Sequence, residues 1–177
     1  SRLETSRSPL SLKGPSLALA RSLPLPQQCQ SHHLLHPGLA MTIEYIDYGE
    51  SLGASVSLNL PAPLRDLADA CNDNSDFDIV EFRRISDDSF ALVVDAGDGT
   101  FDAENPVGIR RMERLALVLN PTLGFPWEVR ALRFDFPVTM HQNHVEPNSP
   151  RSLCLYVEPW SSVERTWSPQ SFLARAL

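Results

Sequence analysis

Cys154 is the residue of this sequence best placed to do covalent chemistry. It lies in Pro-Arg-Ser-Leu-Cys-Leu-Tyr-Val, residues 150–157, a stretch that is typical of a short strand. A cysteine acts as a nucleophile when its thiolate can be reached and when nearby donors can stabilise the oxyanion that forms on the attacked carbonyl. The same stretch is apolar enough to be buried, and cysteine is among the residue types most often found in cores. The residues alone leave Cys154 as either a nucleophile or a packed side chain.

Polar residues upstream of Cys154 could assist such a nucleophile. His141, Asn143, His144 and Asn148 could each donate a hydrogen bond, and three prolines between positions 137 and 150 stiffen the intervening chain. An asparagine amide suits an oxyanion because it donates without a proton transfer. With His141 or His144 as a base, a cysteine hydrolase is also conceivable, although no Gly-x-Cys-x-Gly elbow surrounds the cysteine.

The three cysteines, Cys29, Cys71 and Cys154, do not form a disulfide pattern. Their number is odd, their spacings are unrelated, and no Cys-x-x-Cys occurs. This pattern favours a reducing compartment, for which we expect the cytoplasm. His141, His144 and Cys154 could supply three zinc ligands, but they lack the paired spacing of structural zinc sites, and we expect no bound metal.

Hydrophobic periodicity predicts the elements that must position Cys154. Leu64, Leu67, Ala68 and Cys71 recur at helical spacing, which predicts an amphipathic helix with Cys71 on its core face. After this helix the period changes to two, and the pattern predicts four strands in a meander over 77–85, 89–96, 114–120 and 128–134. An irregular stretch that contains prolines, a short strand over 152–157 and a helix from about Ser168 follow. This order is typical of an antiparallel sheet covered by helices, the α+β class.

The two ends of the chain lead to expectations about its domains. Residues 1–40 hold one acidic and four basic residues and are rich in Ser, Pro and Leu, whereas the composition changes at Met41. We interpret 1–40 as a disordered leader, either non-native or translated from an upstream region, with an organelle transit peptide as the alternative. The domain would then be 41–177. Its last helix is still in apolar register at Leu177 without a stop signal, so we expect a C-terminally incomplete fragment.

The charge balance of residues 41–177 bears on possible partners. This part carries 11 arginines against 21 acidic residues, a net charge of −10. Binding to a phosphate backbone needs clustered cations, so we expect no nucleic-acid partner. No run approaches the ~20 apolar residues of a membrane span, so we expect no membrane association either.

Three short motifs near the end of the chain resemble one known family. The motifs are Phe136-Pro137, Leu153-Cys154-Leu155 and Trp167-Ser168-Pro169. Their order is that of the proline segment, the thioester cysteine and the start of the next helix in ubiquitin-conjugating enzymes. Over roughly residues 60–177 the sequence resembles this family. It is particularly similar to the bacterial members that occur beside, or fused to, a ThiF-like adenylating domain. The resemblance implies a fold with an N-terminal helix, a four-stranded antiparallel meander, an active-site loop and a following helix.

The resemblance also implies a transferase reaction. A ThiF-like activating enzyme, in cis or in trans, would pass the activated C-terminus of a ubiquitin-like protein to the Cys154 thiolate. An amine of a protein target would then attack the thioester. The conjugating domain itself would need no cofactor, because ATP is used by the activating partner. The alternatives are a non-catalytic binding module on the same fold, in which Cys154 is only packed, and the cysteine hydrolase.

The sequence departs from the family pattern in the segment before the cysteine. His141-Gln142-Asn143 lacks the central proline of the family's His-Pro-Asn and lies farther from Cys154, whereas Asn148 lies nearer but has no histidine two positions before it. Both asparagines therefore remain candidates for the oxyanion donor, and His141 remains a candidate site residue.

Two tryptophans follow Cys154. We interpret Trp160 and Trp167 as packing residues.

Overall fold

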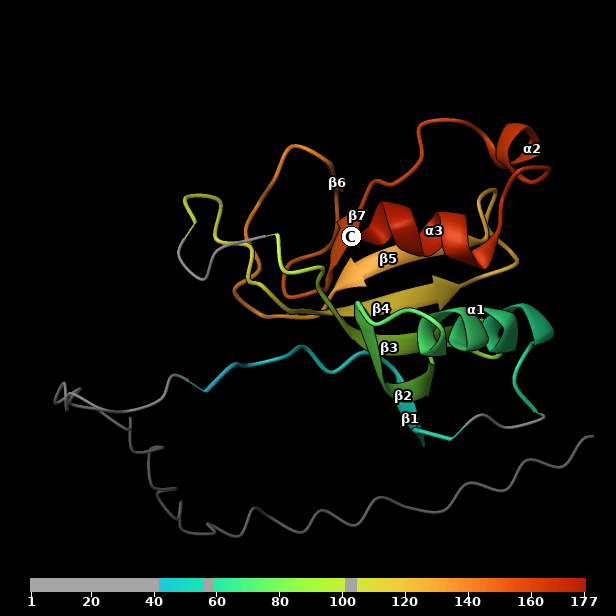
Figure 1. Ribbon diagram of the computed structural model, residues 1–177, viewed down its shortest axis with the longest axis horizontal. Coiled ribbons are helices and arrows are strands. Elements are labelled where there is room, and N and C mark those ends of the chain that lie inside the picture. Colours follow the sequence, from blue (N-terminus) through green and yellow to red (C-terminus); the bar gives the residue numbers. More distant parts are fainter. Residues whose placement is uncertain (1–41, 56–58, 101–104) are drawn as a thin grey trace, which may run out of the picture. The chain divides into compact units, whose positions relative to one another are not determined.

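The structure is a computed structural model that describes residues 42–55, 59–100 and 105–177 (Figure 1). The predicted leader, 1–40, lies outside the described residues. Within them, the chain forms an α+β unit built on one antiparallel sheet.

The four predicted strands are present and pair as a meander. They are β2 (Phe77–Arg84), β3 (Phe90–Ala96), β4 (Glu113–Leu119) and β5 (Trp127–Ala131). Each pairs antiparallel with the next along the chain. The sheet of the described residues has the order β1-β2-β3-β4-β5-β7-β6, so three further strands lie at its edges.

The edge strands are where the sequence-based prediction is wrong or incomplete. β1 (Glu50–Gly53) and β6 (Gln142–Asn143) were not expected, and β7 (Arg151–Leu153) ends one residue before Cys154 instead of continuing to residue 157. All four residues of β1 are exposed, and β6 and β7 are two and three residues long. Strands of this kind are held by backbone pairing and bury too few side chains to produce a period of two.

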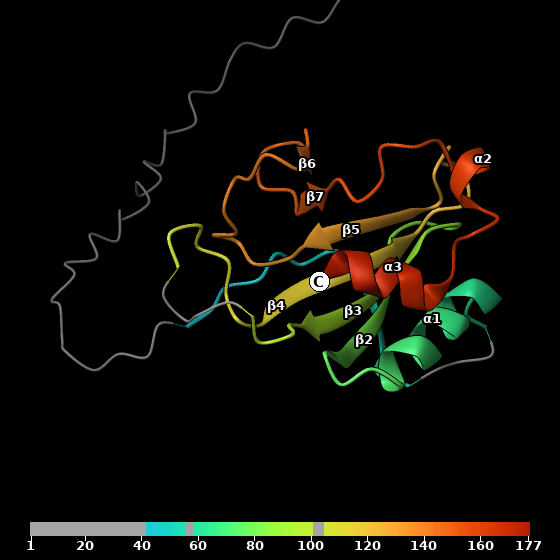
Figure 2. The ribbon, with the colours of Figure 1, turned by 45° about the horizontal axis from the view of Figure 1, so that its top comes forward.

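Two helices lie on the same face of the sheet, as Figure 2 shows. These are α1 (Ala62–Asn72) and α3 (Pro169–Ala176), which also contact each other. α3 begins as predicted: the Ser168 hydroxyl accepts from the backbone N–H of Ser171, and the Ser171 hydroxyl accepts from the backbone N–H of Ser168. This capping box satisfies backbone donors of the first turn. A short helix that was not predicted, α2 (Trp160–Val163), lies in the connection before α3.

The main core lies between this helical layer and the sheet. It contains Leu64 and Leu67 of α1, Phe82 of β2, and Phe172 of α3, none of which is exposed. Cys71 lies in the same core, which confirms its prediction as a packed residue, and burial raises the pKa of its thiol to about 12. Cys71 is therefore uncharged and unreactive at neutral pH.

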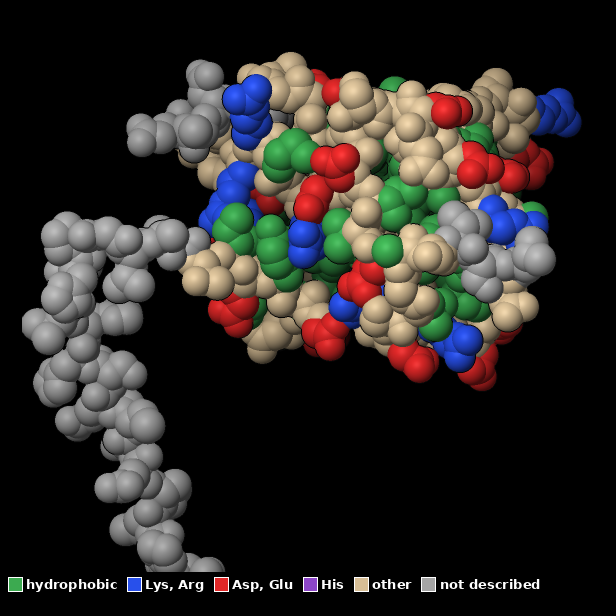
Figure 3. All heavy atoms as spheres, turned by 60° about the horizontal axis from the view of Figure 1, so that its bottom comes forward, with side chains coloured by type: hydrophobic (Ala, Val, Ile, Leu, Met, Phe, Trp, Pro, Cys, Tyr) green, Lys and Arg blue, Asp and Glu red, His purple; other side chains and the backbone are tan. Residues whose placement is uncertain are grey.

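The opposite face of the sheet is covered by the segment that precedes β1. Tyr45 and Tyr48 pack against a second apolar cluster, and their rings lie under the guanidinium groups of Arg114 and Arg130 at 4.3 and 5.5 Å. The second cluster consists of Ala91, Val93, Ala116, Val118 and Leu132. Figure 3 shows the molecule from below relative to Figure 1, and basic and acidic side chains are interspersed there rather than gathered into patches.

A buried ion pair links the start of β4 to the segment after β5. Arg133 and Glu113 are 3% and 6% exposed, and the guanidinium donates to both carboxylate oxygens at 2.8 and 2.7 Å. Arg133 also donates to Asp135 and to the backbone carbonyl of Gly108. The Arg133 guanidinium holds the pKa of Asp135 below its usual value through this hydrogen bond. These bonds attach the loop between β3 and β4 to the chain that leads to Cys154.

None of the helices in the described part of the chain has the length and apolar character needed to cross a membrane.

Candidate functional site

Cys154 lies directly after β7, at the point where the strand pairing with β6 ends. Its backbone N–H donates to the carbonyl of His141 at 3.0 Å, and its thiol donates to the carbonyl of Tyr156 at 3.7 Å. The side chain is partly exposed, unlike that of Cys71. Cys154 therefore has the accessibility that a nucleophile requires.

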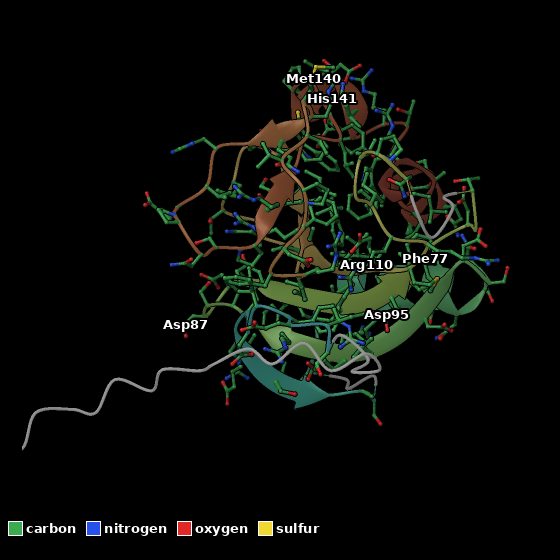
Figure 4. The ribbon with its side chains drawn as sticks, turned by 90° about the vertical axis from the view of Figure 1, so that its left-hand side faces the viewer. Phe77, Asp87, Asp95, Arg110, Met140 and His141 are labelled. Atoms are coloured by element: carbon green, nitrogen blue, oxygen red, sulfur yellow. The ribbon has the colours of Figure 1, made fainter. Side chains whose placement is uncertain are left out.

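The β6–β7 register brings His141 and Asn143 to Cys154. In the β6–β7 pairing, Asn143 lies opposite Ser152 and Gln142 lies opposite Leu153. His141 therefore lies opposite Cys154, one position beyond the paired strands. Side chains two residues apart lie on the same side of an extended strand, so the side chains of Ser152 and Cys154 share one side. Asn143, the pairing partner of Ser152, has its side chain on that side too. His141 and Met140 lie together on the segment before β6, at the top of the view in Figure 4. His141 is exposed, and Met140 is 95% exposed.

Asn148 and His144 lie in the loop that connects β6 to β7. Asn148 occupies a turn with φ of 64°, in which the N–H of Ser149 donates to the carbonyl of Glu146 at 3.1 Å. Asparagine tolerates this left-handed conformation better than most residues. Both Asn148 and His144 are exposed, and neither lines a cavity beside Cys154. The structure thus brings together Cys154, His141 and Asn143, and leaves Asn148 in the loop.

A chain of hydrogen bonds holds the Asn143 amide. Its Nδ2 donates to Ser152 Oγ at 2.9 Å, and Ser152 Oγ donates to Glu128 Oε1 at 2.5 Å. The other oxygen of Glu128 accepts from Arg130 Nε at 3.0 Å. Ser152 is only 1% exposed, so this chain runs behind the surface of the site. Asn143 keeps a second N–H on Nδ2 that can donate to a ligand.

Cys154 lies in the wall between two cavities. The first, which we call the arginine-lined cavity, has a volume of about 230 Å³, and Cys154 and His141 both border it. Its cationic residues are Arg110, Arg111 and Arg175. The second, which we call the aromatic cavity, has a volume of about 500 Å³, and Cys154 and Asn143 both border it. Its aromatic residues are Phe125, Trp127, Tyr156 and Trp160.

α3 holds the segment that follows Cys154. Arg175 donates to the carbonyl of Leu155 at 3.2 Å, and its guanidinium lies over the ring of Tyr156 at 4.5 Å. The Tyr156 ring stacks on Phe125 at 4.6 Å, and Phe125 in turn meets Trp160 edge-on at 5.1 Å. Burial raises the pKa of Tyr156. The two cavities share Leu153, Cys154 and Leu155, and the bond from Arg175 to the Leu155 carbonyl holds this shared wall.

Trp160 and Trp167 pack as predicted. Trp167 stacks on Trp127 at 4.9 Å and contacts Phe172, and Trp160 meets Trp167 edge-on at 6.1 Å. Trp160 has a second role that was not predicted, because it also borders the aromatic cavity.

Several residues of the site were not predicted from the sequence. Glu128 and Ser152 were read only as strand residues, and Arg175 only as part of the last helix. Two of their contacts join residues 24 and 20 positions apart, so no local pattern could indicate them. A usable signal was the polar Ser152 at the start of the apolar run Leu153–Val157, since a buried hydroxyl needs a partner.

The conceivable zinc site is not formed. In the part of the chain that the structure describes, which includes His141, His144 and Cys154, no three His, Cys, Asp or Glu side chains are grouped so that they could hold a metal ion.

Comparison with known proteins supports a family for the second half of the chain. Residues 91–176 match the family model of prokaryotic E2 family A, and this range runs from β3 to α3 and contains every candidate site residue. No curated protein and no solved structure matches the chain. The family match supports the resemblance to ubiquitin-conjugating enzymes, whereas the association with a ThiF-like domain stays a prediction. Residues 91–176 are thus similar to a bacterial E2-like family, prokaryotic E2 family A.

Proposed function

We propose that this protein carries a ubiquitin-like protein as a thioester on Cys154 and passes it to an amine of a protein target. The observation that carries the proposal is the position of Cys154, partly exposed between two cavities within a region that matches prokaryotic E2 family A. A packed cysteine of a pure binding module would have no need of this access.

The proposed reaction has two acyl-transfer steps. The Cys154 thiolate attacks the carbonyl of the C-terminal acyl-adenylate, so that a carbon–sulfur bond forms and AMP leaves with the electrons of the carbon–oxygen bond. The target amine then attacks the thioester, a carbon–nitrogen bond forms, and the thiolate of Cys154 leaves. Both steps pass through an oxyanion, which a neutral amide N–H can stabilise.

Asn143 and His141 have different parts in this proposal. Asn143 borders the aromatic cavity with Cys154, and its second N–H can donate to the oxyanion. His141 borders the arginine-lined cavity with Cys154 and can accept the proton that the attacking amine loses.

The partners follow from the same proposal. A ThiF-like activating enzyme, in cis or in trans, supplies the acyl-adenylate and consumes the ATP, and the conjugating domain needs no cofactor of its own. We place the reaction in the cytoplasm, where the thiol of Cys154 stays reduced.

The direct test is the formation of an adduct on non-reducing gels. The protein is incubated with its ThiF-like activating enzyme, the ubiquitin-like protein, ATP and Mg²⁺, and an adduct that disappears on treatment with a thiol reductant is expected. Absence of an adduct, together with binding of the ubiquitin-like protein, would instead favour the non-catalytic module. Turnover of a thioester or peptide substrate without an activating partner would favour the hydrolase.

Replacing Asn143 should impair transfer more than replacing Asn148. Loss of one oxyanion donor slows acyl transfer by about 10²- to 10³-fold, so we expect Asn143→Ala to slow thioester discharge by about this factor. Asn148→Gly, which permits the same positive φ, should leave discharge unchanged, because Asn148 lies in the exposed β6–β7 loop. Single-turnover discharge of the preformed thioester measures both variants, and the reverse order would assign the donor to Asn148.

Glu128→Gln should disturb the site while the core stays intact. A carboxylate only accepts hydrogen bonds, so Glu128 makes Ser152 donate to it and accept from Asn143. In the variant, Arg130 retains the amide oxygen of the new glutamine, whose NH₂ then faces Ser152 and reverses the chain. The Ser152 hydroxyl proton is then free to donate to the Asn143 amide oxygen, so the amide loses its single fixed orientation. We expect discharge to slow by about tenfold because a donor is misplaced.

The matched control for Glu128→Gln is Glu146→Gln, which changes an exposed acid of the β6–β7 loop. Thermal unfolding and the pH profile of discharge should be recorded for both variants. A loss of activity in Glu128→Gln that follows only from a lower unfolding temperature would show a structural role alone.

A further inference from the structure

The orientation of the Asn143 amide depends on a carboxylate that a further side chain holds. Glu128 Oε1 accepts from the Ser152 hydroxyl, which in turn accepts from Asn143. Glu128 Oε2 accepts from Arg130 Nε at 3.0 Å. Arg130 Nη1 also makes a long hydrogen bond of 3.5 Å to the carbonyl oxygen of Pro150, the residue before β7. Arg130 therefore determines which oxygen of Glu128 is left to face Ser152.

Arg130 and Glu128 project from the face of the sheet opposite α1 and α3. They are two residues apart on β5 and share one side of it, and the residues that alternate with them are buried in the main core. Their side chains are 21% and 20% exposed. Ser152 lies opposite Arg130 in the β5–β7 pairing and is buried. The chain of hydrogen bonds to Asn143 thus starts on the second face of the sheet.

Tyr48 covers the Arg130 guanidinium on that face. The centroid of its ring lies 5.5 Å from the guanidinium carbon, within the range of a cation–π contact. Burial raises the pKa of Tyr48, so the ring is uncharged at neutral pH. A ring in this place attracts the guanidinium and takes up the space into which it could swing. Tyr48 therefore restricts Arg130 to the orientation in which it contacts Glu128.

The segment that carries Tyr48 is attached to the sheet on both sides of this residue. Two residues before it, the N–H of Ile46 donates to the carbonyl of Leu132 at 2.7 Å. One residue after it, the carbonyl of Gly49 accepts from Arg83 Nη1 at 3.0 Å. These bonds hold the backbone that places the Tyr48 ring against β5.

We propose that Tyr48 and Arg130 are positioning residues, which fix the Asn143 amide in the orientation that stabilises the oxyanion. The inference rests on the proposed function, because this amide matters only if acyl transfer takes place beside it. Neither residue is a catalytic residue, since both act through the chain of hydrogen bonds. Tyr48 lies outside residues 91–176, the range that matches the family model, so the functional unit includes the segment before β1.

Arg130→Lys tests the role of the guanidinium. Lysine keeps the charge but lacks the rigid fork with which Arg130 holds Glu128. We expect single-turnover discharge of the preformed thioester to slow by about tenfold at saturating amine, with no change in the amine concentration that gives half the maximal rate. In the Asn143→Ala background the same substitution should cause no further slowing, because the amide through which Arg130 acts is gone.

Tyr48→Leu tests the ring, with Tyr45→Leu as the matched control. Both tyrosines pack against the second apolar cluster and lie under an arginine, but Arg114 over Tyr45 pairs with Asp95 of β3, which β4 separates from β5. We expect Tyr48→Leu to slow discharge by about threefold and Tyr45→Leu to leave it unchanged. Thermal unfolding should show a comparable loss of stability in both variants. Tyr48→Phe should retain most of the rate that Tyr48→Leu loses, because the ring over Arg130 is still present.

The orientation of the Asn143 amide can be followed without any partner protein. Its Nδ2–H signals in the ¹H–¹⁵N spectrum of the full chain are identified by their disappearance in Asn143→Ala. We expect these signals to shift and broaden in Arg130→Lys and in Tyr48→Leu, because the amide then samples more than one orientation. In Tyr45→Leu they should stay as they are in the wild type.

Three outcomes would contradict the proposal in distinguishable ways. Equal slowing by Arg130→Lys in the wild-type and Asn143→Ala backgrounds would show that Arg130 acts through stability or direct contact with the substrate. Equal rates for Tyr48→Leu and Tyr45→Leu would remove Tyr48 from the positioning chain. If no thioester forms, the proposed function fails, whereas the Asn143 signals still decide the positioning, and unchanged signals in Arg130→Lys and Tyr48→Leu would overturn it.

Discussion

The Cys154→Ala variant is expected to form no reducible adduct with the ubiquitin-like protein. The thiol supplies the only bond through which the proposed carrier holds its cargo, so the loss should be complete within the sensitivity of the gel, about 10³-fold or more. Cys154 is partly exposed and outside the main core, so the variant should unfold at nearly the same temperature as the wild type.

Two other substitutions make this result specific to Cys154. Cys154→Ser should give an adduct that resists thiol reductants but is cleaved by base, because an oxygen ester replaces the thioester. Cys71→Ala should still form the reducible adduct, since Cys71 lies fully buried in the core with a thiol pKa of about 12. A reducible adduct that persists in Cys154→Ala would place the nucleophile elsewhere.

Arg133→Met is expected to lower the free energy of unfolding by about 3–5 kcal/mol. The substitution leaves Glu113, 6% exposed, without the guanidinium that contacts both of its oxygens at 2.7 and 2.8 Å. An uncompensated buried charge costs far more than the pair itself contributes. The bonds from Arg133 to Asp135 and to the Gly108 carbonyl are lost as well. Urea unfolding followed by circular dichroism measures the change.

Arg114→Met is the matched control for this prediction. Arg114 makes a two-pronged contact with Asp95 at 2.8 Å, but both side chains are about a third exposed, so the loss should be about 1 kcal/mol or less. The double variant Arg133→Met with Glu113→Leu should recover much of the stability, because no charge is left buried. Equal losses in the two single variants would mean that burial does not determine the contribution of Arg133.

Elements with a clear hydrophobic period could be predicted, and those formed by pairing at the sheet edges could not. Residues close together in the sequence indicate α1, the four strands of the meander and the start of α3 at Ser168. The spacing of these residues follows the geometry of a helix or a strand. β1 and β6 have no such pattern, because they bury almost nothing and depend on the strands beside them.

The sequence by itself determined that Cys154 is a candidate nucleophile, that Cys71 is a core residue, and that the domain is an acidic α+β unit. The tertiary structure decided which upstream groups lie beside Cys154. The register of β6 against β7 places His141 and Asn143 there and leaves the nearer Asn148 in the loop. Distance along the chain does not measure distance in space, because backbone pairing reverses the chain and sets which residues face each other. For the same reason, the contacts of Glu128 and Arg175, and the two cavities on either side of Cys154, exist only in the folded protein.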